Sequence, residues 1–186
     1  MKRIAALLIS VCMLSGCSQN DTNLNKAMDF RKQLLAAQGC FFDVSISADF
    51  GEDVYTFQMS CTGDNTGKIS FVVTEPESIS GITGFIDETA ASVTFHDNIL
   101  AFPVLADGQL SPVSAPWLFL KTMRGGYLSA CGNSGDRMLI SMDDSFSENA
   151  FHMDIYADSE AVPVAVEVFW QQKRIISLEI KNFTLL

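Results

Sequence analysis

The stretch GCFFDVSISADFGEDVYTFQMSCTGD, residues 39–64, sets the pattern that most of this 186-residue chain repeats. Apolar residues occupy every second position on both sides of Phe50 and Gly51, so each half has one apolar and one polar face. Such alternation is typical of half-buried β-strands, and Gly51 marks a turn between them. The stretch therefore predicts an antiparallel hairpin whose two strands share one apolar face.

The register of this hairpin decides where two cysteines lie. If the chain turns at Phe50 and Gly51, opposed residues have numbers that sum to 101, and both apolar faces stay together. Cys40 then lies opposite Cys61, at a separation where a disulfide can form. A slip of two residues would keep the faces and separate the thiols, and a bridge to Cys131 is the alternative pairing.

Strand-like alternation continues through most of the remaining chain. Further strands are predicted at 68–74, 82–87, 91–96, 98–103, 126–131, 136–142, 150–157, 163–170 and 174–184. A helix is predicted before them at 24–38, capped by one of residues 21–23, with an apolar stripe of Ala27, Met28, Leu34 and Leu35. The fold class is therefore α+β, mainly antiparallel β.

A second helix interrupts the strands at SPVSAPWLFLKTMRGG, residues 111–126. Prolines stand at its start and two glycines at its end, as at helix termini. Its apolar residues surround most of the helix, so it has to be buried against the concave face of a curled sheet. These residues either fill a core or line a lipid-sized cavity; they are Trp117, Leu118, Phe119, Leu120 and Met123.

The amino terminus carries an export signal. Lys2 and Arg3 precede an apolar run from Ile4 to Leu14, which is too short to span a bilayer permanently. The run ends in Leu-Ser-Gly-Cys at 14–17, which resembles the lipobox of bacterial lipoproteins. The resemblance implies cleavage before Cys17 and a diacylglyceryl group on its thiol; the alternative is a plain secretory signal with a chance cysteine.

This reading divides the chain into a signal peptide (1–16), a lipidated cysteine with a polar tether (17–23) and a single domain (24–186). The mature chain would carry 10 basic and 22 acidic residues, a net charge of −12. So acidic a surface opposes binding to nucleic acid, and the membrane link has to be the lipid. The expected location is the extracytoplasmic face of the cell membrane.

Residues that could perform catalysis are few. His96 lies in a turn-like stretch and His152 on the polar side of a strand, and no nucleophile motif accompanies them. The glycine-containing stretch 63–70 is interpreted as a hairpin turn, and the acidic stretch 143–149 as a solvated turn rather than a calcium site. The sequence predicts a non-enzymatic protein without metal or cofactor.

Three stretches together resemble the LolA/LppX-type lipoprotein fold, which includes GerS-like proteins. They are LNKAMDFRKQLLAAQGCFFDVSISADF (24–50), VVTEPESISGITGFI (72–86) and VPVAVEVFWQQKRIISLEIKNFTL (162–185). The resemblance implies a curved, unclosed half-barrel that cups its inserted helices. It further implies binding of a lipid or acyl chain in the concave face, or, as the alternative, a ligand-free module that binds an envelope protein.

The lipobox leads to a first prediction. In Cys17→Ser the thiol that accepts the diacylglyceryl group is absent, so the precursor should stay unlipidated and uncleaved. Metabolic labelling with a fatty-acid analogue, followed by gel electrophoresis, measures both. Equal label on the wild type and on Cys17→Ser would contradict the assignment.

Overall fold

The structure of the chain is a computed structural model. It describes residues 18–186 except 50, 52–53, 96–97, 103–104 and 107–108. The predicted signal peptide, Cys17 and His96 lie outside the described residues, so their assignments stay predictions.

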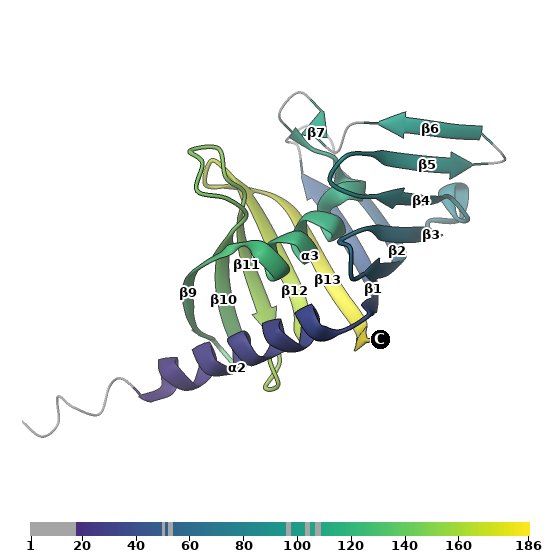
Figure 1. The fold of residues 1–186 in the computed structure, drawn as a ribbon. Helices are drawn as coiled ribbons and strands as arrows, with labels where there is room; N and C mark the ends of the chain where they lie inside the picture. Colours follow the sequence, from purple (N-terminus) through teal and green to yellow (C-terminus); the bar gives the residue numbers. More distant parts are fainter. Residues whose placement is uncertain (1–17, 50, 52–53, 96–97, 103–104, 107–108) are drawn as a thin grey trace, which may run out of the picture.

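Antiparallel strands make up a single curved sheet of eleven strands (Figure 1). In chain order they are β1 (Gly39–Asp49), β2 (Val54–Asp64), β3 (Ile69–Glu75), β4 (Thr83–Ile86), β5 (Ala91–Phe95), β6 (Asn98–Phe102), β9 (Tyr127–Ser134), β10 (Arg137–Asp143), β11 (His152–Ala157), β12 (Pro163–Trp170) and β13 (Lys173–Leu185). A separate two-stranded ribbon, β7 (Leu105–Ala106) and β8 (Gln109–Leu110), was not predicted. The predicted class, an α+β half-barrel with one unclosed sheet, is confirmed.

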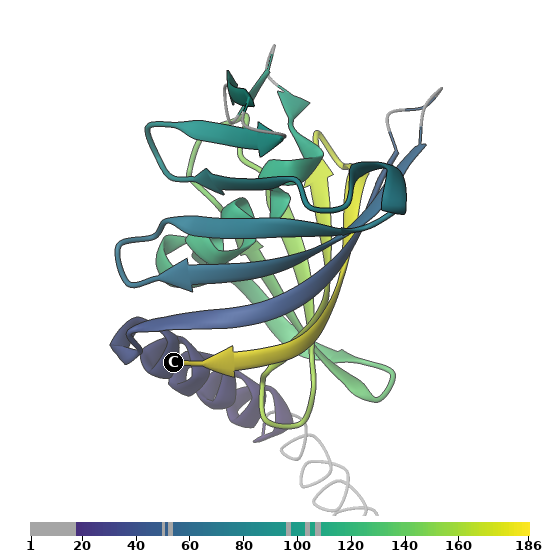
Figure 2. The same ribbon diagram turned by 90° about the vertical axis from the view of Figure 1, so that its right-hand side faces the viewer.

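The order of the strands explains how one sheet forms from two meanders. It runs β6-β5-β4-β3-β2-β1-β13-β12-β11-β10-β9, so the chain moves outward from β1 to one edge and returns from the other edge to β13. Antiparallel pairing of β1 with β13 joins the two meanders (Figure 2). Asn182 reinforces the junction from β13 by donating a hydrogen bond to Asp43 Oδ2 at 2.7 Å.

The predicted register of the first hairpin is wrong by two residues. Phe42 lies opposite Cys61, and Cys40 lies opposite Gly63. The reason is the turn: Asp49 pairs with Val54, so the turn is centred one residue later than predicted. Gly51 adopts a positive φ of 98°, and its amide donates a hydrogen bond to Asp49 Oδ1 at 2.8 Å.

The first helix, α2 (Ser18–Ala36), includes the residues predicted as a tether. Its buried face consists of Asn23, Ala27, Phe30 and Leu34, whereas the predicted stripe residues Met28 and Leu35 are exposed. Hydrogen bonds to β9 determine which face of α2 is buried. The side-chain amide of Asn23 donates to Gly132 O at 3.1 Å and to Asn133 Oδ1 at 2.8 Å. Within the described ranges, no helix combines the length and apolar character needed to cross a bilayer.

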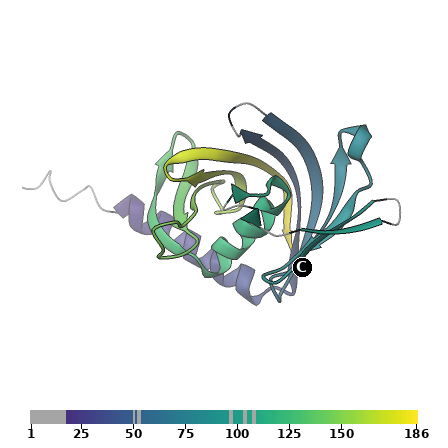
Figure 3. The same ribbon diagram turned by 90° about the horizontal axis from the view of Figure 1, so that it is seen from above.

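The inserted helix, α3 (Ala115–Gly125), lies in the hollow of the sheet, as predicted, and follows a short 3₁₀ turn, η2 (Pro112–Ser114). Seen from above, strands β9 to β13 curl around α3, and α2 passes across the end of this curl (Figure 3). Another 3₁₀ turn, η1 (Glu77–Ile79), links β3 to β4. The packing of α3 therefore determines whether the hollow of the sheet is filled or open.

Candidate functional site

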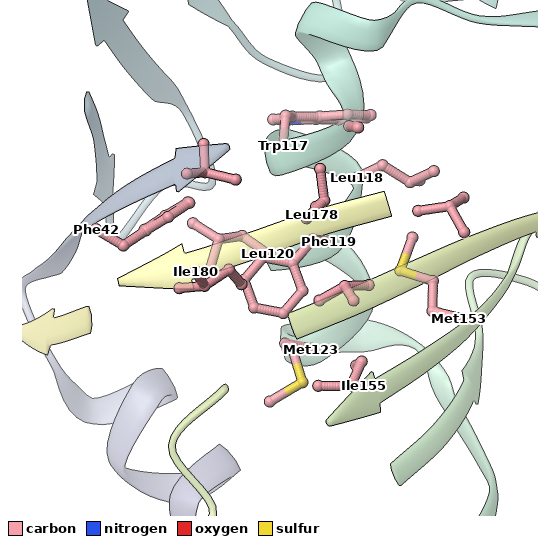
Figure 4. Close-up of a cluster of buried hydrophobic side chains, with 14 of the residues drawn as sticks. Phe42, Trp117, Leu118, Phe119, Leu120, Met123, Met153, Ile155, Leu178 and Ile180 are labelled. Carbon is pink, nitrogen blue, oxygen red and sulfur yellow. The ribbon is translucent and has the colours of Figure 1, made fainter. Parts of the chain in front are cut away.

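The apolar side chains of α3 are packed into the core. Of the five that the sequence singled out, none is more than 6% exposed: Trp117, Leu118, Phe119, Leu120 and Met123. They meet side chains from β1, β11 and β13, including Phe42, Met153, Ile155, Leu178 and Ile180 (Figure 4). The Phe42 and Phe119 rings meet edge to face, with centroids 6.1 Å apart. The structure thus brings the candidate cavity-lining residues together as a packed cluster.

Hydrogen bonds hold the C-terminal end of α3 in place. Arg31 of α2 donates to the carbonyl oxygen of Arg124 from Nε at 3.2 Å and from Nη2 at 2.8 Å, and from Nη1 to that of Gly126 at 3.0 Å. Arg124 in turn donates to the carbonyl oxygens of Asp64 at 2.6 Å and Asn65 at 3.1 Å, in the β2–β3 turn. Both guanidinium groups also complement the negative end of the helix dipole. The helix is therefore tied both to α2 and to the sheet.

A pocket of about 310 Å³ with charged side chains in its lining opens beside α3. Trp117, Lys121 and Arg124 contribute to it from one face of the helix, at a spacing of four and three residues. Glu88 and Asp144 add two carboxylates from loops of the sheet, so the charges of the lining residues balance. The Lys121 ammonium lies 5.1 Å from the centre of the Trp117 ring. Such a mixed, charged lining suits polar groups and not an acyl chain.

The apolar space between α2 and the sheet is very small. A pocket lined by Ala27, Met28, Arg31, Met123, Leu128, Ile140 and Met142 has a volume of about 10 Å³. A cavity of that size holds about one water molecule. It leaves no room for a lipid chain.

The outer part of the sheet, strands β4 to β6, is here called the distal wing. Register places Leu100 opposite Val93, Val93 opposite Gly84 and Gly84 opposite the buried Phe71, so these residues share the concave face. Leu100 is nevertheless 68% exposed there, and Ile99 is 75% exposed on the other face. The distal wing therefore presents apolar side chains that the core does not cover, a feature that no sequence pattern indicated.

The cysteines do not form the predicted bridge. The three thiols are all free, namely Cys40, Cys61 and Cys131. The predicted pairing of Cys40 with Cys61 depended on the predicted hairpin register, and both are wrong. Cys40 and Cys61 are buried, and burial raises the pKa of both thiols. Cys131 is half-buried, and partial burial raises the pKa of its thiol as well.

His152 lies between two carboxylates on the outer face of the sheet. Its Nδ1 is 2.8 Å from Asp143 Oδ1, and its Nε2 is 3.4 Å from Asp154 Oδ1. The nearby Ser141 hydroxyl donates to Asp154 at 2.6 Å and so is bonded to a carboxylate, not to the imidazole that would activate it. This arrangement supports strand pairing between β10 and β11.

The other stretches considered for chemistry form turns. Asp64 Oδ1 accepts hydrogen bonds from the amides of Thr66 at 2.9 Å and Lys68 at 3.1 Å, which makes 63–70 the predicted hairpin turn. Asp144 Oδ1, in the acidic stretch, accepts a hydrogen bond from the backbone amide of Phe151, just after the stretch, at 2.8 Å. Among the described residues, no three side chains of His, Cys, Asp or Glu gather in a way that could hold a metal ion.

Comparison with known proteins gives matches only in structure. No family model matches the sequence, and no curated protein matches it. Similar solved structures include a putative outer membrane lipoprotein-sorting protein domain from Vibrio parahaemolyticus (TM-score 0.49, 10% identity, covering 89% of this chain and 93% of that one). A second is a LolA superfamily protein from Nitrosomonas europaea (TM-score 0.44, 8% identity, covering 91% of this chain and 94% of that one). A third is Mycobacterium tuberculosis lipoprotein LppX (TM-score 0.41, 11% identity, covering 87% of this chain and 93% of that one). These similarities concern the fold alone, and the half-barrel itself is established by the strand order of this chain.

The burial of the thiols predicts their order of reaction. At pH 8 the raised pKa values keep all three thiols protonated, so exposure decides the order: the core shields Cys40 and Cys61, and the half-buried Cys131 should be alkylated first in the folded protein. After unfolding without reductant, all three should react. Peptide mapping by mass spectrometry after iodoacetamide treatment measures this, and a disulfide-linked peptide would contradict the prediction.

Proposed function

We propose that this chain is an exported lipoprotein, attached to the membrane through Cys17, whose half-barrel binds a protein partner and performs no catalysis. One observation carries the proposal: α3 occupies the hollow of the sheet with its five large apolar side chains at most 6% exposed. A module of this kind uses its surface, since its interior is a packed core. The lipid at Cys17 holds that surface at the extracytoplasmic face of the membrane.

A lipid-carrying role, the first expectation from the sequence, has less support. Pockets for small molecules typically enclose 300–1,000 Å³ and are lined mostly by apolar groups. Here the pocket of about 310 Å³ has four charged side chains in its lining, and the apolar pocket beside α2 measures about 10 Å³. An acyl chain could enter the space that α3 fills only if α3 left the core, at the cost of exposing Trp117 and Phe119.

The distal wing is the surface that we assign to the partner. Leu100 and Ile99 expose apolar side chains on opposite faces of β6, which is the last strand of the sheet. An edge strand with apolar side chains readily pairs with another chain. The partner that fits is a protein segment with apolar side chains and basic flanks, because the mature chain has a net charge of −12.

Site-specific photo-cross-linking in the native envelope tests this assignment. With a photoreactive residue at Ala101, in β6, we expect a cross-link to one defined protein. Leu100→Asp should abolish the cross-link while the protein stays folded, since Leu100 is 68% exposed.

Lys181→Asp is the matched control, because it adds the same side chain on β13, outside the distal wing, and should leave the cross-link intact. A cross-link that survives Leu100→Asp, or none at all, would contradict the proposed docking surface. Mass spectrometry of the product identifies the partner.

A further inference from the structure

We propose that an exposed apolar stripe on α2 rests on the phospholipid surface and sets the orientation of the whole domain on the membrane. The stripe consists of Leu24, Met28 and Leu35, which are 37%, 39% and 53% exposed. The inference rests on the proposed attachment through Cys17, and it adds a second contact with the bilayer that the anchor alone does not provide.

Helix geometry places the three side chains in one line. Successive residues of an α-helix are rotated by about 100°, so positions 24, 28 and 35 fall within about 40° of one another around the axis. The buried face of α2, with Asn23, Ala27, Phe30 and Leu34, lies on another side of the helix. α2 therefore has two apolar stripes, one in the core and one on the surface. The side chain of Met28 also lines an apolar seam with Leu128 and Met142 of the sheet.

The position of α2 in the chain brings the stripe to the bilayer. Ser18, the first residue of α2, directly follows Cys17 in the sequence. Two acyl chains on Cys17 would therefore hold one end of a helix about 28 Å long at the lipid surface. A helix that begins there has one end at the headgroups, and its exposed apolar stripe favours the orientation in which its length lies along the lipid surface.

Contacts with the body make the orientation of α2 the orientation of the domain. Arg31 binds the end of α3, and the Asn23 amide binds β9. Lys26 Nζ donates a hydrogen bond to the carbonyl oxygen of Ser159, in the β11–β12 loop, at 2.7 Å. Whatever the stripe touches is therefore fixed relative to the sheet.

A lipid surface repels α2 less than it repels the rest of the domain taken together, because of its charge. Residues 18–36 contain three basic and two acidic side chains, whereas residues 37–186 contain seven basic and twenty acidic ones. Anionic lipid headgroups attract basic side chains and repel acidic ones. Lys32, whose side chain is 73% exposed, lies close to the stripe on the helix circumference and suits the headgroup layer.

The stripe is too small to bind a membrane by itself, because it offers only three partly exposed side chains. The anchor raises the effective concentration of the stripe at the lipid surface, so a weak contact is enough to select one orientation. With α2 on the bilayer, the distal wing lies at the far end of the molecule and projects away from the membrane (Figures 1 and 2). That orientation presents β6 to other proteins.

Fluorescence quenching by lipids tests the orientation. The full lipidated protein, with a fluorescent amino acid at a single position, is placed in vesicles of phosphatidylethanolamine and phosphatidylglycerol that contain spin-labelled lipid. A fluorophore at Met28 should be quenched several-fold more than one at Asp29, which lies about 100° further around the same helix. A fluorophore at Leu100 should escape quenching.

A second set of variants separates orientation from attachment. The triple variant Leu24→Ser, Met28→Ser, Leu35→Ser should remain on the vesicles but lose the difference between a fluorophore at Lys32 and one at Leu100. The control variant Ile99→Ser, Leu100→Ser should keep the difference in quenching. In this control the fluorophore at Lys32 is compared with one at Ala101, because Leu100 is already replaced. Equal quenching at Met28 and Asp29 in vesicle-bound protein would overturn the orientation and leave the anchor standing. Absence of the wild type from the vesicles would overturn both.

Discussion

The burial of α3 is the constraint on which the rest of the structure depends. A helix that is apolar around most of its circumference has to be enclosed, and a single flat sheet face cannot do this. The curled sheet and α2 together enclose it, while Arg31 satisfies the carbonyl groups at its end. The pairing of β1 with β13 is needed for this enclosure, because it joins the two meanders into one surface that can wrap around the helix.

Enclosure of α3 also separates the molecule into a filled part and an open part. The filled part extends from β10 through β13 to β1, β2 and β3, where the apolar residues of the concave face are buried. The distal wing continues the same sheet away from α3: Ile86 and Ala91 on its concave face are still buried, whereas Leu100 on the edge strand β6 is exposed. An apolar surface at the end of a stable scaffold is suited to binding another protein. The functional proposal follows from this division.

The sequence predicts the elements better than their relative placement. Period-two alternation locates nearly every strand, and the bulky apolar centre of residues 111–126 predicts a buried helix. The register of the first hairpin cannot be predicted from this alternation, because a slip of two residues preserves both faces of the hairpin. The turn at Asp49 and Gly51 determines which of the two registers forms. The buried face of α2 depends on contacts of Asn23 with a strand 109 residues away, which local periodicity does not reveal. Whether Trp117 lines a cavity or fills a core depends in the same way on packing.

Mass spectrometry of the lipids that co-purify with the mature protein tests the filled hollow most directly. The protein would be extracted with organic solvent under conditions that leave the acyl groups on Cys17 covalently attached, and the free lipid in the extract would be quantified against the protein. A packed α3 predicts no lipid at a stoichiometric level. About one free lipid molecule per protein would contradict the account, because the hollow of the sheet would then hold a ligand in place of a complete core.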